Sequence, residues 1–247
     1  MKEKDNIYFY SNLLEGKETR GLWGKDRRFA PEKIAVNPSV LAYFLPIIQP
    51  WITEESKVLD FGCGPGSFFS VLSPLCQELY GIDVVPAFID AANAHSINAG
   101  LKNASAHTYE ELVNRVDHEY FDVVLMLDVI HHVENVNEVM NRAKRMLKPN
   151  GHLIVFEPNR RNPLLALMCL LDKNERTLLK MGNYPYYRKI LGESGFTVVD
   201  HDWNAMLIGP DSSIARTIAD KLENSPVKIL RGFLPKMTIT ARRGEVE

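Results

Sequence analysis

Cysteine is scarce in this 247-residue chain, which contains only Cys63, Cys76 and Cys169. Their spacing matches no metal-ligand motif, and an odd number argues against the disulfide framework that stabilises many small secreted domains. Charge of one sign is not in excess either, because 29 Lys and Arg stand against 31 Asp and Glu, for a net charge of −2. Nucleic-acid-binding domains usually carry a strongly basic face. These absences predict a cytoplasmic protein with no nucleic-acid partner.

Long hydrophobic runs are absent as well. The longest, LLALMCLL at 164–171, is too short to cross a bilayer, which takes about 20 apolar residues. The N-terminal residues MKEKDNIYFY lack the apolar core of a signal peptide. With 45% hydrophobic and 24% charged residues, the composition is that of a globular protein. We therefore expect one domain over residues 1–247, monomeric or homodimeric, with no integral membrane segment.

The segment VLDFGCGPG, residues 58–66, is the most informative part of the chain. Its first four residues have the apolar pattern of a short buried strand, and its glycines predict a sharp turn toward a helix that begins near Ser67. Glycine accepts positive φ in such a turn and lets a ligand lie on the bare backbone. The segment LYGID, residues 79–83, predicts a second strand that ends in Asp83. An acidic side chain about 20 residues after a glycine-rich turn accepts hydrogen bonds from ribose hydroxyls.

Apolar segments further along predict an open sheet of mainly parallel strands with helices between them. The run FDVVLML at 121–127 is typical of a central strand that is covered on both faces. Ligands bind outside the carboxyl ends of parallel strands, so the polar residues that follow these strands are expected at one site. They are Asp83, Asp128, His131, His132, Glu157 and Asn159. The other predicted strands cover 104–108, 152–157, 196–199 and 236–241, and the predicted helices cover 38–48, 86–98, 136–147 and 185–191.

The glycine spacing separates two kinds of cofactor site. The dinucleotide fingerprint G-x-G-x-x-G requires a third glycine at position 67, where Ser67 stands. The spacing G-x-G-x-G, with Asp60 just before it, instead resembles motif I of class I S-adenosylmethionine-dependent methyltransferases. Phe121–Asp122 and the segment LGESGF at 191–196 also resemble this family, and the resemblance covers about residues 50–200. The chain is most similar to the methyltransferases of ubiquinone, menaquinone and secondary-metabolite biosynthesis.

The resemblance implies a Rossmann-like α/β fold: a doubly wound, mostly parallel sheet of seven strands, with helices on both faces and a helical lid. It also implies that an N-terminal helical leader, residues 1–55, folds over the cofactor, with Tyr10 and Trp23 as candidate pocket residues. The insertions 158–185 and 204–235 would lie on the substrate side. The apolar helix over 164–171 is interpreted as a lid that favours an apolar acceptor, or alternatively as part of a larger core or a dimer interface.

The resemblance further implies S-adenosyl-L-methionine as cofactor and S-adenosyl-L-homocysteine as product. An acidic residue in the position of Asp60 orients the ammonium group directly or through water, and Asp83 holds the ribose. The family's usual acidic contact to the adenine would align near Thr108, so Glu110 or the backbone around Tyr109 are the alternatives here. The predicted cofactor-binding residues are Asp60, Gly62, Cys63, Gly64, Gly66, Asp83, Val84, Thr108, Tyr109, Leu127 and Asp128.

Methyl transfer from a sulfonium is an in-line displacement in which proximity and alignment carry much of the catalysis. A base is needed only when the acceptor must lose a proton. His132 is the first candidate, because relatives often place a histidine there, and His131 is the second. The alternative is that His132 caps the following helix or ties down the loop. One of the two rings is expected to point into the packing. Asp128, Glu157 and Asn159 resemble a catechol-type magnesium site only loosely, so no metal is predicted.

The acceptor is expected to be a small molecule. No DPPY-like or NPPY-like run, which the resemblance would associate with amino-methylation of DNA bases or glutamine, follows residue 127. Oxygen, nitrogen and carbon acceptors all remain open at this point. Two other functions are also compatible with the sequence: a cofactor-binding protein of the same fold without transfer activity, and an NAD-dependent oxidoreductase.

Overall fold

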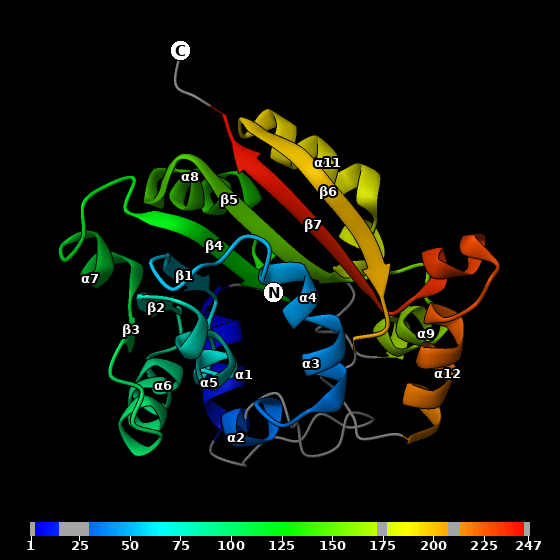
Figure 1. The fold of residues 1–247 in the computed structure, drawn as a ribbon, viewed down its shortest axis with the longest axis horizontal. Helices are drawn as coiled ribbons and strands as arrows, with labels where there is room; N and C mark the ends of the chain where they lie inside the picture. The colour runs from blue at the N-terminus through cyan, green and yellow to red at the C-terminus, as the bar shows by residue number, and fades with distance from the viewer. Residues whose placement is uncertain (1–2, 15–29, 172–176, 207–212, 245–247) are drawn as a thin grey trace.

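A computed structural model describes residues 3–14, 30–171, 177–206 and 213–244 (Figure 1). Trp23, predicted as a pocket residue, lies outside the described residues. Among the described residues, no helix combines the length and apolarity that a membrane span requires.

The centre of the molecule is one sheet of seven strands in the order β3-β2-β1-β4-β5-β7-β6. The strands β1 to β5 pair in parallel, and β7 runs antiparallel between β5 and β6. The strand order reverses between β1 and β4, which makes this the doubly wound sheet that the sequence predicts. The strands are β1 Lys57–Phe61, β2 Glu78–Ile82, β3 Ala104–His107, β4 Phe121–Leu127, β5 Leu147–Pro158, β6 Phe196–Asn204 and β7 Lys236–Arg243.

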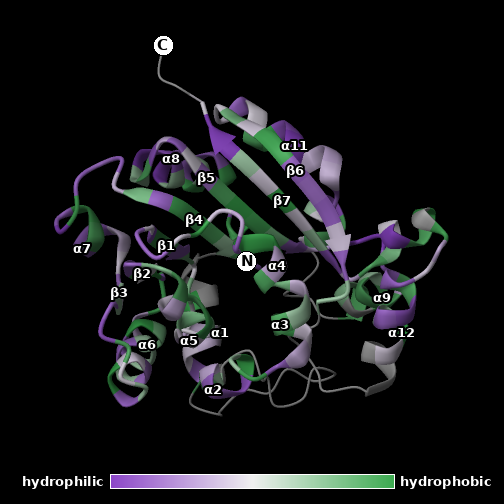
Figure 2. Ribbon diagram, viewed as in Figure 1, coloured by the Kyte–Doolittle hydropathy of each residue, from purple (hydrophilic) through white to green (hydrophobic). Residues whose placement is uncertain are grey.

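Helices cover both faces of this sheet. Successive side chains of a strand point to opposite faces, so in β4 Val124 and Met126 pack on one side, while Val123 and Leu125 pack on the other. Figure 2 shows β4 and β5 largely in the colour of hydrophobic residues, as expected for strands buried twice. The first face carries α7 Tyr109–Val113, α8 Val136–Met146 and α11 Tyr184–Glu193; the second carries α2 Pro31–Ile34, α3 Pro38–Tyr43, α4 Leu45–Ile48, α5 Phe69–Leu72 and α6 Pro86–Asn98.

The structure divides or extends several predicted elements. The helix expected over 38–48 is broken between α3 and α4, where Pro46 supplies no N–H group to the turn. β5 already begins at Leu147, so the last residue of the helix predicted over 136–147 and the turn after it belong to this strand. Within the strand, Asn150 has a φ of 62°. β6 continues to Asn204 because it pairs with β7 along its whole length.

The two predicted insertions form helices at one end of the sheet, on the right in Figure 1. The first contains α9 Pro163–Leu171 and α10 Leu178–Met181, and the second contains α12 Ser213–Glu223 and the 3-10 helix η6 Lys228–Phe233. Asn159 and Asn162 join them, since their side-chain amides donate hydrogen bonds to the carbonyls of Gly232 and Phe233.

Candidate active site

The glycine loop after β1 is bonded to the end of β2. The N–H groups of Gly62 and Cys63 both donate to the carbonyl of Ile82, at 2.8 and 3.0 Å. Gly62 has a φ of 82°, and a Cβ built there would lie 2.5 Å from Val129 Cγ2. Gly64 has a φ of 54°, but a Cβ there would meet nothing within 4 Å. The loop therefore needs glycine at Gly62 for close packing, and at Gly64 it presents bare backbone to open space.

Asp83 fastens the same loop from the other side. Its Oδ2 accepts a hydrogen bond from the N–H of Gly64, and its Oδ1 accepts one from the N–H of Val85, both at 2.9 Å. Burial raises the pKa of Asp83, although these backbone N–H bonds oppose the rise. The carboxylate lines the pocket, and each oxygen retains acceptor capacity for a ligand hydroxyl.

Asp60 is a buried carboxyl group that faces the same pocket. The residue is 2% exposed, and no hydrogen bond to its carboxyl group is formed by the part of the chain that the structure describes. Burial, and to a smaller extent the charge of Asp83, raises the pKa of Asp60 to about 7. A buried carboxylate without a partner is costly, so a cationic group of a ligand is the natural counter-charge at this position.

Cofactor affinity is expected to depend on pH through Asp60. Suppose that the ammonium group of S-adenosylmethionine pairs with the ionised carboxylate of Asp60. Lowering the pH from about 7.5 to about 6 should then weaken cofactor binding roughly eightfold, because the ionised fraction of a group with a pKa of about 7 falls by that factor. Titration calorimetry with S-adenosylhomocysteine measures this. In Asp60→Asn the affinity should be lower and the dependence gone; an unchanged pH dependence in that variant would assign it to another group.

The stability of the cofactor-free protein depends on pH in the opposite direction to cofactor binding. The folded-state pKa of Asp60 lies above its ordinary value of 3.8, so the folded protein binds more protons than the unfolded chain between these two values. The contribution of Asp60 to the free energy of unfolding therefore falls as the pH rises from about 4 to about 7.

Gly62→Ala is expected to lower the free energy of unfolding by about 2 to 4 kcal/mol, because positive φ and an overpacked contact with Val129 both oppose the methyl group. Gly100→Ala is the matched control: Gly100 has a φ of 69° but open space around its Cβ position, so a loss of about 1 kcal/mol is expected. Urea unfolding distinguishes the two. Equal losses would mean that contact with Val129 is unimportant.

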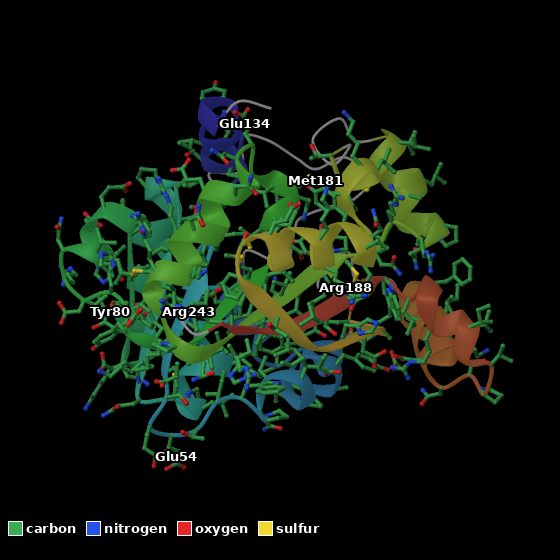
Figure 3. The ribbon with its side chains drawn as sticks, turned by 90° about the horizontal axis from the view of Figure 1, so that it is seen from above. Glu54, Tyr80, Glu134, Met181, Arg188 and Arg243 are labelled. Atoms are coloured by element: carbon green, nitrogen blue, oxygen red, sulfur yellow. The ribbon has the colours of Figure 1, made fainter. Side chains whose placement is uncertain are left out.

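These loops enclose a pocket of about 640 Å³ at the carboxyl ends of β1, β2 and β4. One wall comes from the N-terminal helix α1 Glu3–Leu14, whose Tyr10 packs against Phe88 at a ring distance of 5.8 Å. Glu134, which is labelled in Figure 3, also lines the pocket. The predicted cofactor-binding residues that line the pocket are Asp60, Gly62, Cys63, Gly64, Asp83, Val84, Thr108, Tyr109, Leu127 and Asp128.

Two predicted site residues are not in this lining, Gly66 and His131. Gly66 has a φ of 74° and lies against Ala92 of α6, so it packs the loop on a helix. The described residues of the insertions 158–185 and 204–235 do not contribute to the lining either. Their role as a lid stays a prediction. Tyr10 of α1 is the part of the N-terminal helix that lines the pocket.

The two adjacent histidines lie in different surroundings. His132 lines the pocket, with its Nε2 at 3.4 Å from the hydroxyl oxygen of Tyr10. His131 is 2% exposed, and its Nδ1 lies 2.5 Å from Oε2 of Glu157. Both sit on the short 3-10 helix η4 Ile130–His132 after β4. Of the two candidates for a base, only His132 therefore faces the pocket.

Glu157, near the end of β5, binds the loop after β4 that carries Val129 to His132. The fully buried carboxylate accepts hydrogen bonds from the N–H groups of Val129 and Ile130, at 3.0 and 2.7 Å, and from the hydroxyl of Tyr187 at 3.1 Å. Burial and the nearby Glu157 raise the pKa of Tyr187 well above its ordinary value, so the phenol remains a donor. Glu157 thereby fixes the backbone that carries Val129 and His132.

The helices α7 and α8 meet at the pocket, where Arg142 of α8 contacts Tyr109 of α7. The Thr108 hydroxyl accepts from the N–H of Glu111 at 3.1 Å in a capping box, which begins α7 at Tyr109. The Arg142 guanidinium lies 4.5 Å from the centre of the Tyr109 ring and pairs with Glu138 at 2.6 Å. Glu110 lines the pocket nearby. This corner offers an aromatic face and several polar groups.

The three residues of the loose magnesium alternative have other partners. Asp128, with a φ of 57°, pairs with Lys236 at 2.5 Å, and the amide of Asn159 donates to the carbonyls of Gly232 and Leu234. Glu157 accepts hydrogen bonds from the N–H groups of Val129 and Ile130 and from the hydroxyl of Tyr187. Within the described residues, no group of three His, Cys, Asp or Glu side chains is arranged to hold a metal ion.

Several pocket residues were not predicted from the sequence: Phe88, Val129, Glu138 and Arg142. Gly81 was also missed, although a glycine inside a strand often marks a close approach. A Cβ at Gly81 would lie 2.6 Å from the Phe69 ring and 2.7 Å from Cys63 Sγ. Gly81 therefore lets the glycine loop and α5 pack directly on β2.

Comparison with known proteins identifies the family. Residues 27–201, more than half of the chain, match the model of the methyltransferase domain. The ubiquinone biosynthesis O-methyltransferase of Maricaulis maris is 30% identical over 177 residues, which is 68% of both chains. The protein of the same name from Azorhizobium caulinodans is 32% identical over 155 residues, 59% of this chain and only 60% of that relative.

The fold is shared with solved structures. A SAM-dependent methyltransferase from Aquifex aeolicus superposes with a TM-score of 0.58 at 18% identity, covering 86% of this chain and 97% of that one. The chain therefore belongs to the methyltransferase domain family and has the class I fold, as predicted. Family membership identifies S-adenosylmethionine as the cofactor and gives no support to the NAD-dependent alternative.

Proposed function

We propose that this protein transfers the methyl group of S-adenosylmethionine to an oxygen, nitrogen or carbon atom of a small, apolar acceptor. The names of its relatives favour oxygen. The observation that carries the proposal is that one pocket is lined both by Asp60, Asp83 and the bare backbone of Gly64, where the cofactor would bind, and by His132. A cytoplasmic setting and a monomeric or homodimeric state stay predictions.

The residues of the pocket fit the cofactor. Asp60 would pair with the ammonium group, because its buried carboxyl group needs a counter-charge. Asp83 would accept from the ribose hydroxyls, and the corner with Tyr109 and Arg142 would take the adenine. When bound, S-adenosylmethionine supplies an electrophilic methyl group on a sulfonium.

His132 has the position of a general base in this proposal. Its imidazole borders the pocket beside Tyr10, and a neutral imidazole accepts a proton near pH 7. It would remove the proton of an acceptor hydroxyl as the new bond to carbon forms. Glu157 acts through the backbone and through His131 as a positioning residue, and Tyr10 shields the reacting groups from water.

The test is incubation of the purified protein with methyl-labelled S-adenosylmethionine and a cell extract, followed by identification of the labelled small molecule. A labelled product whose formation depends on the protein supports the proposal and identifies the acceptor atom. Tight binding of S-adenosylhomocysteine with no labelled product in any extract fraction would instead support a binding protein without transfer activity.

A further inference from the structure

The helix α9 exposes a stripe of leucines on the surface. Leu164, Leu167, Leu170 and Leu171 are each between 53% and 61% exposed. Their spacing places them on neighbouring turns of one side, while Cys169 on the other side is buried. Large apolar side chains gathered in this way on one face usually mark an interaction site.

The second insertion extends this apolar face. Ile229 and Phe233 of η6 are 77% and 44% exposed, and the carbonyl of Phe233 accepts a hydrogen bond from the Asn162 amide at the start of α9. The same Asn162 caps α9, since its Oδ1 accepts from the N–H groups of Leu164 and Leu165. We call α9, α10 and η6 together the insertion face; Figure 1 shows α9 at the right end of the molecule, beside α12.

Among the described residues, the insertion face and the loop that leads into α9 carry more basic than acidic side chains, in contrast to the whole chain. Arg160 and Arg161, which directly precede α9, and Lys180 of α10 are exposed, and among the described residues none of the three pairs with a carboxylate. The segments 159–171, 177–183 and 224–236 contain no Asp or Glu, whereas the full sequence has a net charge of −2. Of the acidic residues of α12, Asp220 accepts a hydrogen bond from the hydroxyl of Tyr43, and Glu223 pairs with Arg231 of η6, which also pairs with Asp202. The cations that the insertion face offers therefore do not include Arg231.

We propose that the insertion face docks on the surface of a bilayer that contains anionic lipids. Exposed leucines beside arginine and lysine are the combination by which a helix lies in the interface: its apolar side enters the acyl boundary and its cations pair with headgroups. A second copy of this chain fits less well, because a symmetric contact would place the same cations opposite each other. The helices lie on the membrane in this arrangement and do not span it.

Docking in this way would bring the active-site edge of the sheet toward the lipid. The first insertion follows the carboxyl end of β5, and the pocket lies at the carboxyl ends of β1, β2 and β4, which run parallel to β5. An apolar acceptor dissolved in the bilayer would then be near the pocket. The docking itself does not depend on the transfer activity proposed above.

Co-sedimentation with vesicles tests the proposal. The full chain should pellet with vesicles of phosphatidylcholine containing phosphatidylglycerol, and about tenfold less with phosphatidylcholine alone. Leu167→Glu with Leu170→Glu should lower the bound fraction at least about tenfold, and Arg160→Glu with Arg161→Glu should remove the preference for anionic vesicles. Calorimetry with S-adenosylhomocysteine should give unchanged affinity in both double variants, which shows that they are folded.

The control is the double variant Val36→Glu, Ile97→Glu, since these residues are 70% and 79% exposed but lie outside the insertion face. It should bind vesicles as the parent does. Failure of the parent to bind anionic vesicles, or equal loss in the control, would overturn the proposal. Light scattering that shows a dimer dissociated by the leucine variants, without any vesicle binding, would assign the face to self-association instead.

Discussion

Asp83→Ala should weaken the binding of S-adenosylmethionine about 100-fold or more. Two kinds of interaction disappear together. The ribose loses a charged acceptor, and hydrogen bonds to charged groups contribute about 1.5–3 kcal/mol each. The N–H groups of Gly64 and Val85 lose the partner that holds the glycine loop. The dissociation constant from titration calorimetry is the direct measurement, and S-adenosylhomocysteine serves as the stable ligand.

Two further variants separate these contributions. Asp83→Asn keeps an acceptor oxygen, so its loss of affinity should lie between those of the parent and Asp83→Ala. Asp90→Ala removes an exposed carboxylate on α6 outside the pocket and should change nothing. If Asp83→Ala bound the cofactor as tightly as the parent while remaining folded, the assignment of the cofactor side of the pocket would be wrong.

His132→Ala should lower kcat about 100- to 10,000-fold on a hydroxyl acceptor, the range in which general-base catalysis contributes. Cofactor affinity should change little, because Asp60, Asp83 and the glycine loop remain in place. Steady-state kinetics with the acceptor identified by labelling provide the measurement.

His118→Ala is the matched control, since His118 is exposed and outside the pocket lining. Tyr10→Phe should cost far less than His132→Ala, because the hydroxyl of Tyr10 is only at 3.4 Å from the imidazole and the ring still closes the pocket. An unchanged kcat in His132→Ala would show that the acceptor needs no base from this position, and would leave His132 with the structural role.

The sequence alone predicted the doubly wound sheet, and it predicted most of the residues that the structure brings together around one pocket. The strand over 58–61, the glycine turn and Asp83 form a local pattern, because a ligand on bare backbone needs glycine at particular offsets. The seven strands follow from apolar runs whose period and flanking turns are local as well. The order of the strands then brings the loops after β1, β2 and β4 to one edge, which is why the predicted cofactor-binding residues other than Gly66 line one pocket.

Only the tertiary structure decided how the rest of the site is assembled. His131 and His132 are neighbours in the sequence with the same chemistry, and their different surroundings depend on Glu157, Tyr187 and Tyr10, which lie far away along the chain. The contact between Gly62 and Val129 likewise joins two loops. Such contacts depend on the twist of the sheet and on side-chain packing between separate elements, and neither is encoded in the pattern of any single segment.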